Sequence, residues 1–283
     1  MTGQVRLSGF FLQEIQLSER RPPMAELCPL GSGSSGNSTL IRSDGTSILV
    51  DAGLSCKAIC SALEQVGSHY EELDAIFLTH EHSDHIKALP VLLKKVNCPV
   101  YATAPVLDYI SRSLKIPAHT ALVPLEDKPL ALHDLEVRSF ATPHDSVGSV
   151  GYQFRTQDDK LLAVATDLGH MTDEIMSFLL PCKAILLESN YDDGMLMCSS
   201  YPYILKRRIA SSMGHLSNID CAASAVALAQ NGVEHLILGH LSQNNNLPEL
   251  AFTATKNALE LAGCGAVDLR VAKRSHVSEP IQF

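Results

Sequence analysis

The stretch Asp74-Ala-Ile-Phe-Leu-Thr79 is followed at once by His80-Glu-His82-Ser-Asp84-His85. The first segment is a continuous apolar run of strand length, which is typical of a buried strand. The second segment places four potential ligands, three imidazoles and the carboxylate of Asp84, on the loop that leaves this strand. Zinc, manganese and iron select neutral imidazoles and carboxylates as ligands. A single surface histidine does not indicate a metal site, but the spacing H-x-H-x-D-H after an apolar strand predicts one.

Three later apolar runs also carry one candidate ligand at their carboxyl end. His144 follows LEVRSFA, Asp167 follows LLAVA and His240 follows HLILG. The same pattern is repeated each time, so these side chains are further candidates for the metal site.

The pattern of the whole chain predicts an α/β protein. It has 283 residues, of which 46% are hydrophobic, and this is ordinary globular usage. After Pro22-Pro23, short apolar strands alternate with helical segments, which predicts a single domain over residues 25–283. Residues 1–24 lack the apolar core and cleavage site of a signal peptide, and we expect them to be an extension outside the domain. Two sheets, each covered by helices, would bury this pattern of strands and helices.

The pattern gives approximate bounds for the elements. Strands are expected at 26–30, 38–43, 46–50, 74–79, 100–102, 136–141, 149–155, 161–166, 184–188, 235–239 and 267–271. Helices are expected at about 55–67, 86–96, 104–114, 172–180, 204–211, 219–231 and 248–261.

Charge and cysteine content bear on the binding partners and the cellular location of the protein. The formal charge is −9, so the chain as a whole does not have the basic character common in nucleic-acid-binding proteins. The basic run Lys206-Arg207-Arg208 could contact phosphates or form a solvated helix face. The eight cysteines contain no C-x-x-C pair and indicate reduced thiols, hence a cytoplasmic protein. No apolar run reaches the length of a membrane helix, so we expect no membrane association.

The loop Gly31–Gly36 matches the dinucleotide-binding pattern G-x-G-x-x-G. That pattern requires a helix to follow, whereas the strand-like segment STLIRS follows here, and Asn37 stands where a P-loop has lysine. We therefore reject a nucleotide cofactor. Two interpretations remain, a simple turn between strands or an anion-binding nest formed by backbone N–H groups and the hydroxyls of Ser34, Ser35 and Ser38.

From about residue 26 the chain resembles the metallo-β-lactamase-fold hydrolases. The resemblance implies a four-layer αβ/βα sandwich with two divalent metal ions, zinc or manganese, or alternatively iron. By motif, the first metal would be held by His80, His82 and His144. The second would be held by Asp84, His85 and His240, with Asp167 bridging the two. Antibiotic-degrading members often carry cysteine at the position of Asp167, which argues against lactamase activity.

Six segments resemble the YycJ/WalJ-type branch of this family in the same order. They are LCPLGSGSSGNST, THEHSDH, ATPHDSVGSVGY, ESNYD, GHLSNIDCA and LGHLSQNNN. The resemblance implies a metal-dependent phosphodiesterase, a 5′→3′ exonuclease whose substrate is DNA rather than RNA. The alternatives are a small-molecule hydrolase acting on a thioester, lactone or cyclic phosphodiester, an RNA-processing nuclease, and a metal-stabilised interaction protein. The oligomeric state is left open.

The resemblance also suggests further site residues. By similarity to tRNase Z-like relatives, Glu188 and His215 would help to protonate the leaving group, and Asp84 would join them as a catalytic residue. We expect Ser34, Ser35 and Asn37 to hold a terminal 5′-phosphate. Ser217 and Asn218 are further substrate-binding candidates, although either could instead cap the helix that follows.

Overall fold

The computed structural model describes residues 25–282. The expected extension, residues 1–24, lies outside this described part. No helix within it combines the length and the apolarity that crossing a membrane requires.

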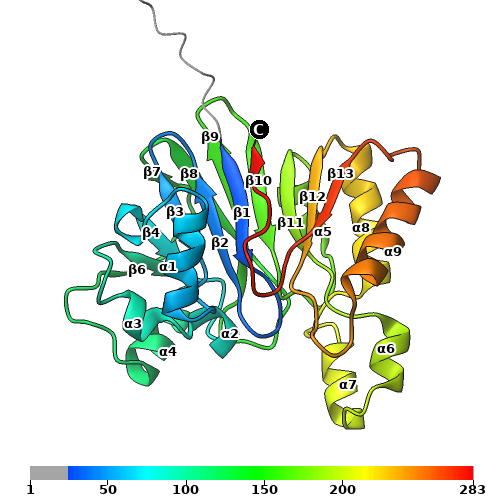
Figure 1. The fold of residues 1–283 in the computed structure, drawn as a ribbon, viewed down its shortest axis with the longest axis horizontal. Coiled ribbons are helices and arrows are strands. Elements are labelled where there is room, and N and C mark those ends of the chain that lie inside the picture. The colour runs from blue at the N-terminus through cyan, green and yellow to red at the C-terminus, as the bar shows by residue number, and fades with distance from the viewer. Residues whose placement is uncertain (1–24, 283) are drawn as a thin grey trace, which may run out of the picture.

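Two mixed sheets of seven strands each form the centre of the molecule (Figure 1). The first has the order β14 (Ile281–Gln282), β1 (Glu26–Gly31), β2 (Ser38–Arg42), β3 (Ser47–Val50), β4 (Ala75–Phe77), β5 (Val100–Ala102) and β6 (Leu122–Pro124). The second has the order β13 (Asp268–Val271), β12 (His235–Gly239), β11 (Ala184–Glu188), β10 (Leu161–Ala165), β9 (Val150–Thr156), β8 (Leu135–Ala141) and β7 (Leu130–Leu132). In each sheet an antiparallel part joins a parallel part, at β3 and at β10 respectively.

The strands are apolar on both faces because both faces of each sheet are buried. On β2 and β3, Leu40 and Leu49 belong to the core beneath the outer helices. Their neighbours Ile41 and Ile48 point the other way, into the core between the sheets. The period-two alternation of side chains therefore supplies two cores from one strand pair.

Helices cover the outer face of each sheet, as Figure 1 shows for α1 on one side and α8 and α9 on the other. The first sheet packs against α1 (Cys56–Gln65), α3 (Leu89–Leu92) and α4 (Ala104–Ser113). The second packs against α5 (Asp173–Leu179), α8 (Asn218–Gln230) and α9 (Pro248–Leu261). This arrangement confirms the expected α/β sandwich of four layers.

One expected helix differs from the structure. The segment 86–96 was expected to be continuous, but it consists of α2 (Ser83–Ile86) and the separate turn α3. Pro90 has no N–H to donate to the carbonyl of Ile86, and the N–H of Ala88 donates to the Ala52 carbonyl at 2.8 Å instead. Asp84 and His85 consequently lie in a short helical turn rather than on an open loop.

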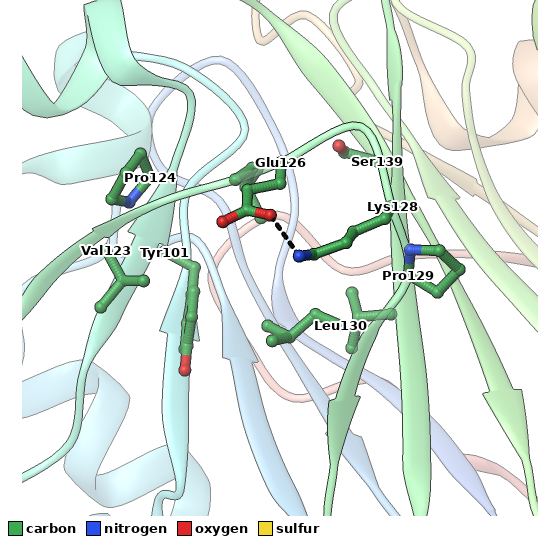
Figure 2. Close-up of a pocket in the computed structure, with 10 residues that line it drawn as sticks. Tyr101, Val123, Pro124, Glu126, Lys128, Pro129, Leu130 and Ser139 are labelled. Atoms are coloured by element: carbon green, nitrogen blue, oxygen red, sulfur yellow. Dashed lines mark ion pairs between the residues drawn. The ribbon is translucent and has the colours of Figure 1, made fainter.

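A small cavity of about 120 Å³ lies where β5 and β6 approach β7 and β8 (Figure 2). Its lining includes Tyr101, Val123 and Leu130, and an ion pair of 2.7 Å joins Lys128 to Glu126 beside it. None of the candidate metal ligands lines this cavity. Its apolar lining residues Tyr101 and Leu130 pack against the core between the sheets.

Candidate metal centre

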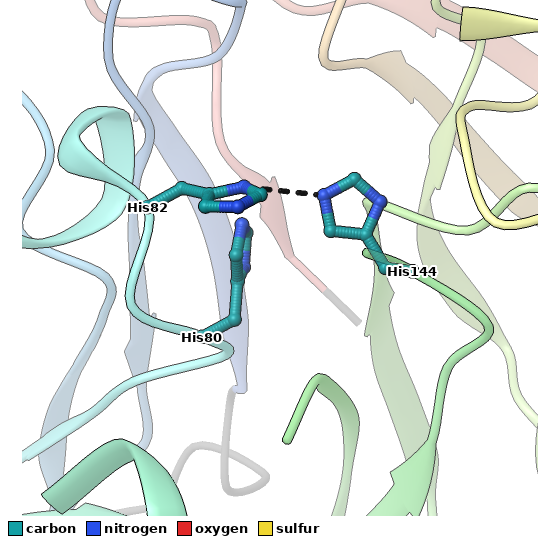
Figure 3. A group of neighbouring side chains, drawn as sticks. All are labelled: His80, His82 and His144. Atoms are coloured by element: carbon teal, nitrogen blue, oxygen red, sulfur yellow. Dashed lines mark hydrogen bonds between the residues drawn. The ribbon is translucent and has the colours of Figure 1, made fainter. Parts of the chain in front are cut away.

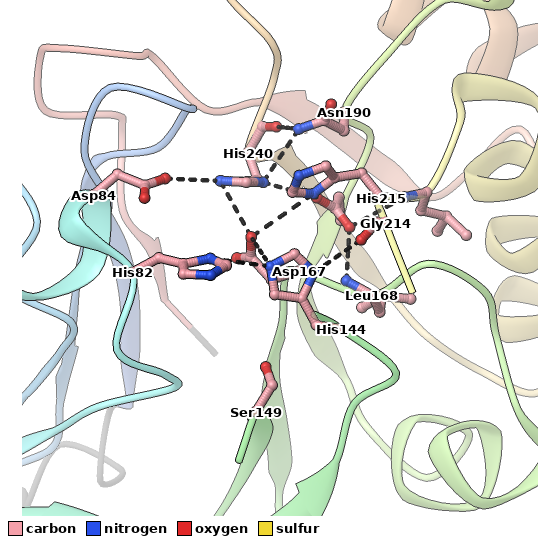
Figure 4. A network of polar contacts seen from close by, with 12 residues as sticks. His82, Asp84, His144, Ser149, Asp167, Leu168, Asn190, Gly214, His215 and His240 are labelled. Carbon is pink, nitrogen blue, oxygen red and sulfur yellow. Dashed lines mark hydrogen bonds and ion pairs between the residues drawn. The ribbon is translucent and has the colours of Figure 1, made fainter. Parts of the chain in front are cut away.

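Three strand ends supply polar side chains to this region, and Figure 4 labels two of them, Asp167 and His240. Asp51 follows β3, Asp167 follows two residues after β10, and His240 follows β12 directly. All three have left-handed backbone conformations, with φ of 63°, 59° and 54°. Such conformations are uncommon for residues other than glycine and are found at functional sites.

The three histidines expected at a first metal lie together in Figure 3. One ring nitrogen of each of His80, His82 and His144 lies within 4.8 Å of the others. His144 Nε2 lies 3.3 Å from His82 Nδ1, while His144 Nδ1 faces the Gly214 carbonyl at 2.9 Å. The backbone contact leaves Nε2 of His144 directed at its two neighbours.

A second group consists of Asp84, His85 and His240. Asp84 Oδ2 lies 3.6 Å from His85 Nε2 and 3.5 Å from His240 Nε2. Asp167 stands between the two groups, because its carboxylate is 3.3 Å from His85 Nε2, 3.5 Å from His240 Nε2 and 3.8 Å from His144 Nε2. The structure therefore brings all seven candidate ligands together. The two expected sets are among the groups of close ligand atoms, and a further group of His80, His85 and Asp167 joins them.

These side chains fit divalent cations. His80 Nε2, His240 Nε2 and Asp167 Oδ2 are buried and have no hydrogen-bond partner among the described residues. Buried polar atoms are almost always paired, and bound cations would satisfy these three. Nitrogen and carboxylate donors in this mixture suit zinc, manganese or iron.

The electrostatics of the cluster also favour a cation. Burial lowers the pKa of His80 well below its usual value, and a neutral imidazole is the form that binds metals. Burial alone would raise the pKa of Asp84, but the nearby imidazoles of His240 and His85 hold it below the usual range. Burial would lower the pKa of His240, yet the charge of Asp167, the nearby carboxylate of Asp84 and the hydrogen bond with Glu188 raise it to about 10. The carboxylates thus attract positive charge to the position between the ligands.

Glu188, expected to help His215 protonate the leaving group, contacts His215 from inside the fold. Its side chain is completely buried and does not line the pocket. Oε1 lies 2.8 Å from His215 Nδ1 and 2.7 Å from His240 Nδ1, while Oε2 accepts from the N–H groups of Leu168 and Leu216. Burial would raise the pKa of Glu188, but the charge and hydrogen bond of His215 lower it. Glu188 is therefore a positioning residue for two histidines rather than a group that touches substrate.

Asp51 is a positioning residue that our sequence analysis missed. Its carboxylate is 3% exposed, lies 2.7 Å from His85 Nδ1, and accepts from the Thr79 N–H at 2.8 Å and the Thr79 hydroxyl at 2.9 Å. The signal was available, since Asp51 follows the apolar run SILV just as Asp167 and His240 follow theirs. Asn190 has a similar role, because its amide donates to the His240 carbonyl at 2.8 Å.

An open pocket of about 270 Å³ lies over the cluster. It is lined by Ser34, His82, Ser83, Asp84, His144, Asp167, Arg208, His215 and His240. Arg208 comes from the basic run whose role the sequence left open, and it also pairs with Asp145. The pocket therefore combines five of the seven candidate ligands with the guanidinium of Arg208 and with a partly exposed histidine, His215.

The glycine-serine loop packs directly against the segment that carries the candidate ligands Asp84 and His85. The N–H of Asn37 donates to the Asp84 carbonyl at 2.8 Å. A Cβ on Gly53 would lie 1.6 Å from that same carbonyl oxygen, so this approach requires glycine. The Asn37 side chain is buried, exchanges hydrogen bonds with Gly33 and lies 3.0 Å from His85 Nε2. Ser34 lines the pocket, and Ser35 is exposed beside it.

Ser217 and Asn218, expected to bind substrate, are used inside the fold. The Ser217 hydroxyl caps α8 by accepting from the Asp220 N–H at 3.1 Å. The Asn218 carboxamide bonds with Ser189 and Asn246. Both residues are 2% exposed and neither lines the pocket, which corrects the expectation in favour of helix capping and core packing.

Comparisons with known proteins agree with this fold and site. The model of the family described as "Beta-lactamase superfamily domain" matches residues 46–241. The chain is 37% identical over 246 residues to "Exodeoxyribonuclease WalJ" of Streptococcus pneumoniae serotype 2, which covers 86% of this chain and 91% of that protein. It is 36% identical over 237 residues to "Exodeoxyribonuclease YycJ" of Bacillus anthracis, covering 83% and 89%.

Among solved structures, the metallo-β-lactamase fold protein YhfI from Bacillus subtilis superposes with a TM-score of 0.71 at 20% identity. The match covers 93% of this chain and 100% of that one, and at this identity it concerns the fold alone. The match of the family model to most of the chain, together with these full-length relatives, shows that the chain belongs to the β-lactamase superfamily and has the metallo-β-lactamase fold.

Proposed function

We propose that this protein is a metal-dependent exodeoxyribonuclease that degrades DNA in the 5′→3′ direction. The main support is a single structural observation, the open pocket in which the ligand cluster, Arg208 and His215 meet. Hydrolysis of a phosphodiester needs these components, and the two full-length relatives named as exodeoxyribonucleases favour DNA as the substrate.

In this proposal the two ligand sets would bind two divalent cations, zinc or manganese with iron as a further option. His80, His82 and His144 would hold one, Asp84, His85 and His240 would hold the other, and Asp167 would contribute to both. When bound, such cations activate water and stabilise charge on the phosphoryl oxygens.

The chain itself supplies the proton and holds the phosphate. The Nδ1 atom of His215 faces Glu188 at 2.8 Å, which leaves Nε2 as the nitrogen available to the pocket. We assign His215 as the donor of the proton to the leaving oxygen, a role that commonly contributes about 10²–10⁴-fold to the rate. The guanidinium of Arg208, which lines the same pocket, is suited to bind a phosphate oxygen.

The glycine-serine loop accounts for selection of the chain end. Ser34 lines the pocket and Ser35 is exposed beside it, so their hydroxyls can donate to a terminal 5′-phosphate. Asn37 contributes indirectly by holding the loop on Asp84.

Two further parts of the proposal concern the setting of the protein. We propose that residues 25–283 form one hydrolase domain and that residues 1–24 are an extension outside it. All eight cysteines fall within the described residues and carry free thiols, which fits a reducing compartment such as the cytoplasm.

The test is digestion of matched DNA oligonucleotides labelled at the 5′ or the 3′ end, with Mn²⁺ or Zn²⁺ added to the full-length protein. A 5′→3′ exonuclease releases the 5′ label as a mononucleotide at once, whereas the 3′ label remains on a fragment that shortens progressively. Internal fragments at the earliest times would contradict an exonuclease. Faster digestion of an RNA oligonucleotide of the same sequence would favour the RNA-processing alternative.

A further inference from the structure

The segment from α6 (Asp193–Cys198) to α7 (Tyr203–Ile209) exposes large apolar side chains next to the most basic run of the chain. Met197 is 69% exposed, Tyr203 71% and Ile204 83%. No residue of α7 is buried, and in Figure 1 both helices project below the layered body. Packing within the described residues therefore does not explain why α7 carries these side chains.

This surface is continuous with the pocket. Arg208, in the last turn of α7, lines the pocket and pairs with Asp145, the residue after the candidate ligand His144. The chain then leads directly to His215, whose N–H donates to the Ile209 carbonyl at 2.9 Å. A polymer that leaves the pocket past Arg208 would meet α7 next.

The spacing along α7 places an apolar residue and a cation together twice. Tyr203 and Arg207 are four residues apart, as are Ile204 and Arg208, so each pair shares a helix face. The Arg207 guanidinium lies over the Tyr203 ring, 5.9 Å from its centroid. An exposed aromatic ring backed by arginine is a usual platform for an unpaired base, and the cations suit the phosphates on either side of it.

We propose that Tyr203, Ile204 and Arg207 form a platform for single-stranded DNA that continues out of the pocket. Tyr203 stacks against a base, Ile204 packs against its neighbour, and Arg207 binds the intervening phosphate. This inference rests on the proposed nuclease function and adds that the enzyme holds its substrate as a single strand beyond the cut bond.

The charge distribution favours DNA over a second copy of this chain. The chain carries a net charge of −9, yet three consecutive cations, Lys206 to Arg208, lie on α7. A symmetric contact between two copies of α7 would bring these cations against one another, which is unfavourable. Inside a duplex the bases are already stacked on both faces, so stacking of one base on Tyr203 requires an unpaired strand there.

The experiment compares the wild-type protein with Tyr203→Ala, Tyr203→Phe and Arg207→Ala, using the dependence of kcat/KM on chain length. The substrates are a 5′-phosphorylated dinucleotide, too short to reach α7, and a long single-stranded oligonucleotide. Tyr203→Ala should lower the ratio of the long to the short substrate by about fivefold or more, the usual effect of losing one stacked base. Tyr203→Phe, which keeps the ring, should retain most of the ratio, and Arg207→Ala should lower it and weaken its dependence on salt. The matched control is Tyr109→Ala on α4, an exposed tyrosine (42%) outside the pocket lining.

An unchanged ratio in Tyr203→Ala, or a fall no larger than that in Tyr109→Ala, would overturn the platform. The platform would also be overturned if sedimentation showed a dimer for the wild type and a monomer for Tyr203→Ala while the kcat/KM ratio stayed the same. That result would identify α7 as a contact between two copies of the chain. If the wild-type protein cleaves neither substrate, the proposed nuclease function fails. In that case, anisotropy of a labelled single strand with wild type and Tyr203→Ala still decides whether α7 binds DNA.

Discussion

Replacing Asp51 by Asn should weaken metal binding without any change to a metal ligand. Oδ1 of Asp51 accepts from the Thr79 N–H, and Oδ2 accepts from the Thr79 hydroxyl and faces His85 Nδ1 at 2.7 Å. An asparagine side chain can still accept from the Thr79 N–H only if its oxygen occupies the position of Oδ1. Its NH₂ group then occupies the position of Oδ2. That NH₂ would then donate to Nδ1 and move the ring proton of His85 to Nε2. Flipping the amide gives no relief, because its NH₂ would then face the Thr79 N–H.

The magnitude follows from the role of Nε2. This atom lies 3.3 Å from Asp167 and 3.6 Å from Asp84, so it is the nitrogen that would bind a cation, and a protonated Nε2 has no lone pair to offer. Losing the group that orients a ligating histidine typically weakens metal affinity by about 10- to 100-fold. That range corresponds to about 1.4–2.7 kcal/mol of binding free energy.

Competition between the protein and a chromophoric zinc chelator measures this affinity directly. Asp74→Asn is the matched control, since Asp74 also accepts a backbone N–H, from Ser47 at 2.8 Å, and also faces a histidine, His133 at 3.3 Å, but contacts none of the candidate metal ligands. We expect Asp74→Asn to bind zinc as the wild type does. Wild-type zinc affinity in a well-folded Asp51→Asn protein would refute the assignment of Asp51 as the group that orients His85.

Three further changes test other parts of the molecule. His215→Ala should retain the metal content of the wild type but lose about 10²–10⁴-fold in DNA cleavage, with a much smaller loss on an aryl phosphodiester whose leaving group needs no proton; equal losses would make His215 a positioning residue only. Ser34→Ala should reduce the preference for 5′-phosphorylated over 5′-hydroxyl ends by about 10-fold or more, the effect of one hydrogen bond to a charged group, and an unchanged kcat/KM ratio would reject the phosphate site. Asp134→Ala should lower the free energy of unfolding by about 1–3 kcal/mol, because the Ser43 hydroxyl, the Gly45 N–H and the Thr46 hydroxyl lose their acceptor. Burial would raise the pKa of Asp134, but these hydrogen bonds lower it. The stabilisation that Asp134 gives the folded state is therefore present above the unfolded pKa of about 3.9 and is lost as pH falls through the folded pKa. In urea unfolding, the difference in unfolding free energy between wild type and variant should become smaller in acid.

The elements that the sequence predicted well are those whose pattern is long and sharply bounded. β11 and β12 match their expected ranges because each is an uninterrupted apolar run, and α9 begins at Pro248, a favoured first residue of a helix. β6, β7 and β14 were missed because they have only two or three residues and lie at or next to sheet edges, where no period can be recognised. The break between α2 and α3 required attention to Pro90, whose effect on the hydrogen-bond pattern outweighed the apolar periodicity.

The candidate ligands could be predicted, but several of the groups that support them could not. His and Asp at the ends of apolar strands are conspicuous in sequence, whereas His144 is oriented by the carbonyl of Gly214, a group that every residue has. Glu188 was assigned to proton transfer by resemblance, and its contact with His215 at 2.8 Å is compatible with that prediction, but its contact with His240 could not be read from the sequence. The hydrogen bonds of Ser217 and Asn218 go to the start of α8 and to Asn246, contacts that only the folded chain brings together.

The backbone adds a reason why these residue types stand at these strand ends. Asp51, Asp167 and His240 all turn the chain with a positive φ. Aspartate and histidine adopt this conformation more readily than β-branched or bulky apolar residues do. At each of these positions one residue meets two requirements, because it permits the turn that ends the strand and directs a polar side chain into the space between the sheets. The metal-binding potential of the fold and the geometry of its strand ends therefore depend on the same residues.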